Sequence, residues 1–163
     1  MASVERPPIS VLINTVTDLA EQIIKKITLD TRANLVAQPQ EGGTPVDTGH
    51  ARANWVASIG APVEEEQGTR PERLLGKLSH PVSTEAAERG IAEIATQYKL
   101  EKGRVFISNN VPYILALNEG HSQQAPAGFV QLAIAKAIEK DLAKEYELTQ
   151  ELLKGGNGSR GGG

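Results

Sequence analysis

The sequence feature that most constrains the fold is a long helical repeat of apolar residues near the N-terminus. Large apolar side chains recur at spacings of three and four between Ile9 and Ile27, with polar residues between them. An α-helix turns every 3.6 residues, so this spacing predicts an amphipathic helix that starts after Pro8 and ends before Pro39. Such an apolar face needs a partner surface. The residues of the predicted face are Ile9, Leu12, Ile13, Val16, Leu19, Ala20, Ile23, Ile24 and Ile27.

Two later segments also have helical spacing. In the middle of the chain, Ser83 or Thr84 can cap a helix whose apolar face is Ala87, Ile91, Ile94 and Ala95. Near the C-terminus, Pro126 stands where a long charged helix can start. The predicted face of this last helix is Val130, Ile134, Ile138, Leu142, Tyr146 and Leu153.

Two short runs favour strands over helices. In the first run, Trp55, Ala57 and Ile59 alternate with Val56, Ser58 and Gly60. This run follows a short helix that Asp47 or Thr48 could cap and that carries Arg52 and Trp55. The second, RVFIS at 104–108, is rich in β-branched and aromatic residues. These runs predict an α+β fold, in which a small antiparallel sheet is flanked by a long N-terminal helix, a middle helix and a long C-terminal helix.

The second strand is followed by a rigid turn. Asn109 and Asn110 favour a turn because their side chains can bond to nearby backbone, and Pro112 presets the entrance of a short helix. That helix is expected to end at Glu119 and Gly120. We expect the turn to expose Tyr113 and the asparagine pair as an anchor for a neighbouring subunit.

Length and composition indicate one domain. The 163 residues are enough for a single core, which we place in residues 1–154. Residues 61–81 form a long connection with an acidic run at Glu64 to Glu66 followed by basic residues, and such connections are usually disordered or functional. Residues 155–163, with the sequence GGNGSRGGG, have the composition of a flexible tail.

Charge and residue usage exclude several classes of protein. The net charge of −3 provides no general attraction for nucleic acid, and the absence of cysteine excludes disulfides, thiolate nucleophiles and Cys-ligated metals. The N-terminal segment contains acid as well as base and leads into an amphipathic run, unlike a signal peptide or a membrane span. We therefore expect synthesis in the cytoplasm and no membrane contact.

Candidate catalytic and metal-binding residues are weak. His50 and His121 lie near Asp47 and Glu119 in sequence, so a hydrolase site is conceivable, but the spacing fits no metal-ligand motif. The possible nucleophiles Ser58, Ser108 and Ser122 lie in no G-x-S-x-G elbow, and no phosphate-binding loop is present. We predict a protein that is not an enzyme and has no cofactor.

A basic stretch offers an alternative function. Arg70, Arg73 and Lys77, which Arg104 could join in space, could touch DNA in a channel or act in a nucleic-acid-binding accessory protein. The adjacent acidic residues favour a solvated loop instead. Alternating acidic and basic residues are also typical of contacts between subunits.

Two blocks of sequence carry a family resemblance. TPVDTGHARANW at 44–55, and the stretch from Val105 to Gly128 with NNVPY, NEG and QQAPAG, match in order the pattern of a tailed-phage tail-component family. This family supplies tail-completion and neck proteins to long-tailed phages. The match organises the chain from about Ile9 to about Leu148, but it leaves the 61–81 loop and the glycine tail undefined.

The resemblance implies a structural role in the virion, assembled in the host bacterial cytoplasm. Subunits would form a ring, expected to be hexameric, that completes the tail or joins it to the head, contacts other neck and tail proteins and touches passing DNA. A tail terminator or head-completion protein is the neighbouring alternative. The residues implied in contacts are Pro45, Asp47, Thr48, Gly49, Arg52, Asn109, Asn110, Pro112, Tyr113, Glu119, Gly120, Gln124, Ala125 and Pro126.

Overall fold

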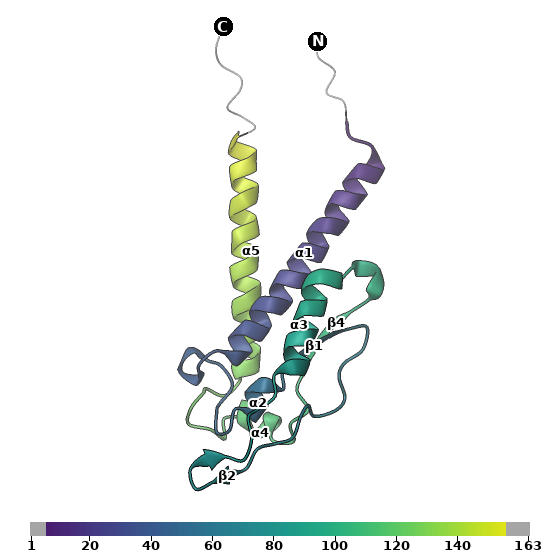
Figure 1. Ribbon diagram of the computed structural model, residues 1–163. Coiled ribbons are helices and arrows are strands. Elements are labelled where there is room, and N and C mark those ends of the chain that lie inside the picture. The colour runs from purple at the N-terminus through teal and green to yellow at the C-terminus, as the bar shows by residue number, and fades with distance from the viewer. Residues whose placement is uncertain (1–5, 156–163) are drawn as a thin grey trace.

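The computed structural model describes residues 6–155, except for the side chains of Tyr146 and residues 148–155. The chain forms two long helices that rise from a mixed body containing the short strands and helices (Figure 1). In chain order the elements are α1 (Ile9–Val36), η1 (Pro39–Glu41), α2 (His50–Ala53), β1 (Val56–Ile59), β2 (Arg73–Leu74), β3 (Lys77–Leu78), α3 (Glu85–Gln97), η2 (Leu100–Lys102), β4 (Val105–Ser108), α4 (Ile114–Asn118) and α5 (Phe129–Gly155).

The central sheet confirms the predicted α+β class. Strands β1 and β4 pair antiparallel, with Val56 opposite Ser108 and Ile59 opposite Val105. Helix α3 packs against β1, and α1 contacts β4. The approach of α3 is close because Gly90 has no side chain: a Cβ atom there would lie 2.2 Å from the Ala57 carbonyl oxygen. The sheet is thus flanked by the three helices that the sequence predicts.

Helices α1 and α5 form an antiparallel pair that opens into a V (Figure 1). In the lower part of the pair, Asn34 Nδ2 donates to the Ala133 carbonyl at 3.0 Å, and Lys140 Nζ lies 3.0 Å from Asp30 Oδ2. Lys26 joins both Asp30 and the buried Asp141. Beyond these contacts the N-terminal half of α1 and the C-terminal half of α5 diverge.

The hydrophobic core lies where the helix pair meets the sheet. Leu35 of α1, Trp55 and the α5 residues Phe129 and Ala133 are all buried and form one cluster. Ile107 of β4 packs against this cluster. The core therefore connects the two sequence blocks, 44–55 and 105–128, with both long helices. It also holds the loops at the lower end of the molecule in place.

The predicted apolar faces of the long helices are only partly buried. On α5 the buried positions are Phe129, Ala133, Ala137 and Asp141, while Ile134, Ile138 and Leu142 are exposed by 41%, 39% and 54%. The prediction that these three residues belong to the buried face was wrong. Helix α5 packs against α1 through its small residues, where the two helices are closest. The side chains of Tyr146 and Leu153 lie outside the described residues.

The same disagreement occurs on two other helices. The apolar residues of α1 from Ile9 to Leu19 are exposed, and the buried positions of this helix begin at Glu21. On α3, Ala87 and Ile94 are buried as predicted, Ile91 is half-buried, and Ala95 is exposed.

Both capping predictions near the motifs need correction. Helix α2 begins after Gly49, whose φ of 88° places it in the left-handed region, and Trp55 follows the helix. Thr48 Oγ1 still accepts the His50 N–H, at 3.3 Å.

Helix α5 begins at Phe129 and not at Pro126, because Asn118 Oδ1 accepts the Val130 N–H at 3.0 Å and so caps the helix from α4.

The 61–81 connection contains a small hairpin. Strands β2 and β3 pair antiparallel through Arg73 with Leu78 and Leu74 with Lys77. Leu75 and Gly76 form the turn with φ values of 51° and 79°. Of the predicted tail, Gly155 is the last residue of α5, and residues 156–163 lie outside the described residues.

Candidate functional site

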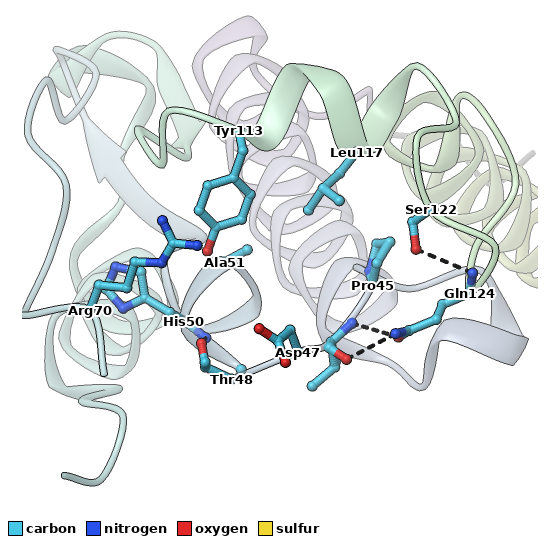
Figure 2. A pocket seen from close by; sticks show the side chains of 12 residues that line it. Pro45, Asp47, Thr48, His50, Ala51, Arg70, Tyr113, Leu117, Ser122 and Gln124 are labelled. Atoms are coloured by element: carbon cyan, nitrogen blue, oxygen red, sulfur yellow. Dashed lines mark hydrogen bonds between the residues drawn. The ribbon is translucent and has the colours of Figure 1, made fainter. Parts of the chain in front are cut away.

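The two sequence blocks, 44–55 and 105–128, meet at a shallow pocket (Figure 2). It lies near α2 and α4, at the lower end of the molecule (Figure 1). The pocket has a volume of about 110 Å³. One wall comes from the segment 45–51, and the other from Tyr113, Leu117, Ser122 and Gln124, with Arg70 of the long loop at one end. Six of the residues implied in contacts line it: Pro45, Asp47, Thr48, Gly49, Tyr113 and Gln124.

Gln124 joins the two blocks through both ends of its amide. Its Oε1 atom accepts the Val46 N–H at 2.8 Å, and its Nε2 atom donates to the Val46 carbonyl at 3.1 Å. The Gln124 N–H is itself bonded to Ser122 Oγ at 3.2 Å. A glutamine amide that bonds to the N–H and the carbonyl of one residue makes the same pair of hydrogen bonds that two opposite residues exchange in an antiparallel sheet. The two loops are therefore held in a fixed relation.

The basic residues of the long loop are turned toward the site. Arg73 Nε donates to Asp47 Oδ1 at 2.9 Å, and the same guanidinium donates to the Asp47 carbonyl. The Arg70 guanidinium lies over the Tyr113 ring, 4.4 Å from its centre. Two of the four basic side chains that we considered for DNA binding, those of Arg70 and Arg73, thus contact the two sequence blocks.

A buried histidine fixes the back of the pocket. His50 is 2% exposed, and its Nε2 atom lies 2.6 Å from Glu66 Oε1. A carboxylate only accepts, so His50 donates in this contact. Asn54 then joins helix and loop, because its Nδ2 donates to the Gln67 carbonyl at 3.1 Å and its Oδ1 accepts the Gln67 N–H at 2.6 Å. His50 therefore anchors the acidic part of the 61–81 loop.

The asparagine pair is half-buried, so the expectation of an exposed pair was wrong. Asn109 Nδ2 donates to the Ala51 carbonyl at 2.8 Å, and Asn109 Oδ1 accepts the Val111 N–H at 3.2 Å. Asn110 Nδ2 donates to the Val63 carbonyl at 2.7 Å. Both amides hold the turn against other segments of the same chain.

Tyr113 is also half-buried. Burial raises the pKa of its phenol, an effect that the Arg70 guanidinium opposes and that Glu66 and Asp47 reinforce. The phenol is therefore neutral at physiological pH, and it can donate or accept a hydrogen bond but does not act as a phenolate base.

The structure places the two candidate histidines apart from each other. His121 is exposed and bonds through Nδ1 to the Ala116 carbonyl at 2.9 Å, so it is not brought to His50. Ser122 lies on the opposite side of the pocket from His50 (Figure 2). Within the described residues, no group of three or more His, Asp or Glu side chains could hold a metal ion.

The other implied contact residues occupy three places. Arg52 lines a second, open pocket together with Arg32 of α1 and Glu88 of α3. Ala125 packs against the core cluster. The exposed remainder, on the loops that flank α4, consists of Pro112, Glu119, Gly120 and Pro126.

The sequence did not identify several residues that build the site. Thr44 is fully buried, donates to the Leu35 carbonyl at 2.6 Å and accepts the Trp55 indole N–H at 2.7 Å. Glu66 and Gln67 hold the loop to α2. Their partners lie 9 to 16 residues away in the chain and follow no periodic pattern, so no local signal could have revealed them.

The fold and the site together define an α+β domain with a polar, internally bonded loop site. No family model, no curated protein and no solved structure matches the chain. Among the described residues, no helix has the length and apolar content needed to cross a membrane.

Proposed function

We propose that this chain is a structural, non-enzymatic subunit of a tailed-phage virion, which forms a ring and completes the tail or joins it to the head. The observation that carries the proposal is that the two blocks resembling the tail-component family contact each other. Gln124 of one block bonds on both sides of Val46 in the other. Residues whose shared role is to shape one surface are expected to meet in this way.

The character of the site also supports a role in assembly. Its hydrogen-bonding groups mostly bond to the protein's own backbone, as Asn109 and Asn110 do. Loops that are fixed before binding lose little conformational entropy when a partner docks.

The proposal is tested by producing phage particles without the chain and imaging them by negative stain. Unjoined heads and tails, or tails with irregular ends, are expected, and a plasmid copy of the gene should restore normal particles. Normal infectious particles in its absence would refute the proposal. Locating the chain in a cryo-EM map of the virion neck separates tail completion from the alternative roles of tail terminator and head-completion protein.

A nucleic-acid-binding role through residues 70–77 is the alternative from another class. Arg70 and Arg73 contact Tyr113 and Asp47, which leaves Lys77 as the basic side chain of the three without such a contact in the described structure. Salt-dependent DNA binding that disappears on charge reversal of Arg70, Arg73 and Lys77 would favour this alternative. We expect no such binding.

A further inference from the structure

The second pocket, which Arg52 lines, is formed by residues of α1, α2 and α3 and of the loops beside them. It has a volume of about 360 Å³. Arg32 of α1 and Arg52 of α2 line it, and Glu88 of α3 is the one carboxylate among its described lining residues. Two guanidinium groups and one carboxylate give the pocket a formal charge of +1. This pocket is therefore positive on a chain whose net charge is −3.

The Arg32 guanidinium lacks a full set of partners. Arg32 is half-buried, and its Nε atom is buried with no hydrogen-bond partner among the described residues. Burial lowers the pKa of Arg32, and the Glu88 carboxylate opposes this effect without cancelling it. A buried donor without an acceptor is unfavourable, most of all when the donor is charged. Arg32 therefore requires an acceptor that the described chain does not supply.

Neither arginine of this pocket forms an ion pair within the described residues. There the arginines in ion pairs are Arg73 and Arg89. Glu88, which shares the pocket, instead accepts the Thr84 hydroxyl at its Oε1 atom, at 2.6 Å. The pocket thus presents two guanidinium groups whose charges have no paired carboxylate in the described structure.

The charge and the donors of the pocket select the class of ligand. Guanidinium groups are planar and bind carboxylate or phosphate oxygens through pairs of parallel N–H···O bonds. Glu88 repels a dianion such as sulfate more strongly than a monoanion, so a single carboxylate fits the charge of +1 best. Thr48 adds a hydroxyl donor, because its Oγ1 atom accepts the His50 N–H and its O–H remains available.

We propose that this pocket binds one carboxylate group, with Arg32 and Arg52 as its charged hydrogen-bond donors. The carboxylate can come from either of two sources, a free carboxylic acid or an acidic side chain of another polypeptide, and both present the same group to the pocket. The inference does not rest on the proposed virion role, because it uses only the charges and bonds around this pocket.

The test is an NMR titration of the isotope-labelled whole chain with sodium acetate at constant ionic strength. Three resonances report binding at the pocket: the backbone amides of Gly49 and Ala53, which line it, and the Arg32 Nε–H. Saturable shifts of these resonances are expected, and sodium sulfate should bind more weakly than acetate. The absence of saturable shifts, or tighter binding of sulfate, would overturn the inference.

Substitutions that remove one positive charge compare the pocket with an arginine elsewhere. Arg32→Gln and Arg52→Gln should each weaken acetate binding at least about tenfold, because each removes charged donors. Arg104→Gln makes the same change in charge at an exposed position outside the pocket and should leave binding unchanged. Circular dichroism verifies that the variants fold. Equal weakening by all three substitutions would indicate general charge attraction and would contradict a specific site.

Glu88→Gln tests the opposite direction of charge. Glu88 is exposed, so this variant should fold even where an arginine variant does not. Removal of the negative charge should tighten acetate binding about two- to fivefold. Unchanged or weaker binding in this variant would show that the charge of the pocket does not select the ligand, and the assignment would fail.

A peptide probe distinguishes the two sources of the carboxylate. Acetate and the blocked peptide acetyl-Gly-Glu-Gly-amide each carry one carboxylate, but only the peptide adds a polypeptide backbone. Tighter binding of the peptide supports an acidic side chain of a partner protein, and equal or tighter binding of acetate supports a free carboxylic acid. Both results support the carboxylate site, whereas a chain that binds neither probe would overturn it.

Discussion

At the scale of single residues, Thr44 shows how one hydroxyl group connects three segments. It bonds to the Leu35 carbonyl of α1 and receives the Trp55 indole N–H from the segment before β1. Valine has nearly the same shape but no hydroxyl, so Thr44→Val leaves a buried indole N–H without an acceptor. We expect the free energy of unfolding to fall by about 1–3 kcal/mol.

Urea unfolding measures this loss, and Thr96→Val is the matched control. The Thr96 hydroxyl also bonds to a backbone carbonyl, that of Ala92 at 2.7 Å, but it is exposed to water on α3. The control should therefore change the stability by less than about 0.5 kcal/mol. Equal effects of the two substitutions would show that the Thr44 hydroxyl has no special role in the core.

Gly90 provides a second prediction at the residue scale. In an exposed helix, replacement of glycine by alanine stabilises the protein by about 1 kcal/mol. At Gly90 the new Cβ atom would lie 2.2 Å from the Ala57 carbonyl oxygen, so α3 must move away from β1. We expect Gly90→Ala to destabilise the protein by about 1–3 kcal/mol.

The exposed α3 position Ala95 calibrates this measurement, because Ala95→Gly should cost about 1 kcal/mol from helix propensity alone. Thermal unfolding of both variants gives the comparison. A Gly90→Ala protein that is more stable than the wild type would contradict the close packing of α3 on the sheet.

At the scale of elements, an ion pair joins α1 to the segment that follows α3. Glu21 Oε2 lies 2.9 Å from Lys99 Nζ, and Glu21 Oε1 accepts the Leu100 N–H at 3.0 Å. These two contacts lower the pKa of Glu21 below its ordinary value of 4.5, and the Glu21 carboxylate raises the pKa of Lys99. The carboxylate is therefore favoured in the folded state.

The sign of the pH effect follows from this lowered pKa. The stabilisation by Glu21 is complete above the unfolded-state pKa and is lost as the pH falls through the folded-state pKa. We expect Glu21→Gln to reduce the loss of stability between about pH 5 and pH 3, compared with the wild type. The exposed Glu93→Gln on α3 is the control, and identical acid sensitivity of the two variants would contradict the prediction.

At the scale of the whole molecule, the body and the arms of the V differ in how they are held. The single tryptophan, Trp55, is buried in the core, whereas much of the helical content lies in α1 and α5, which diverge at their far ends. Helix that lacks tertiary contacts is only marginally stable in water. We expect the far-UV circular dichroism signal to begin to fall before the Trp55 fluorescence changes during heating.

Both probes are followed in the same samples of the wild-type chain during heating. Coincident transitions for the two probes would show that the arms and body unfold as one unit.

The sequence by itself determined the elements and their class. The spacing of apolar residues in 9–27, the β-branched run at Val105 to Ser108 and the turn residues around Pro112 are local signals, and each acts through backbone preferences that depend on neighbouring residues. These signals were sufficient for the α+β class and for most boundaries, within a few residues. The two blocks that meet at the loop site were selected by the family resemblance and not by these signals.

Only the tertiary structure decided which faces are covered and which polar groups meet. The sequence pattern marks Ile134 and Val16 as apolar, but their burial depends on where α1 and α5 approach each other, and the approach is set by contacts such as Asn34 with Ala133. The bond between Gln124 and Val46 spans 78 residues. Such pairings depend on the path of the whole chain, so no local pattern can encode them.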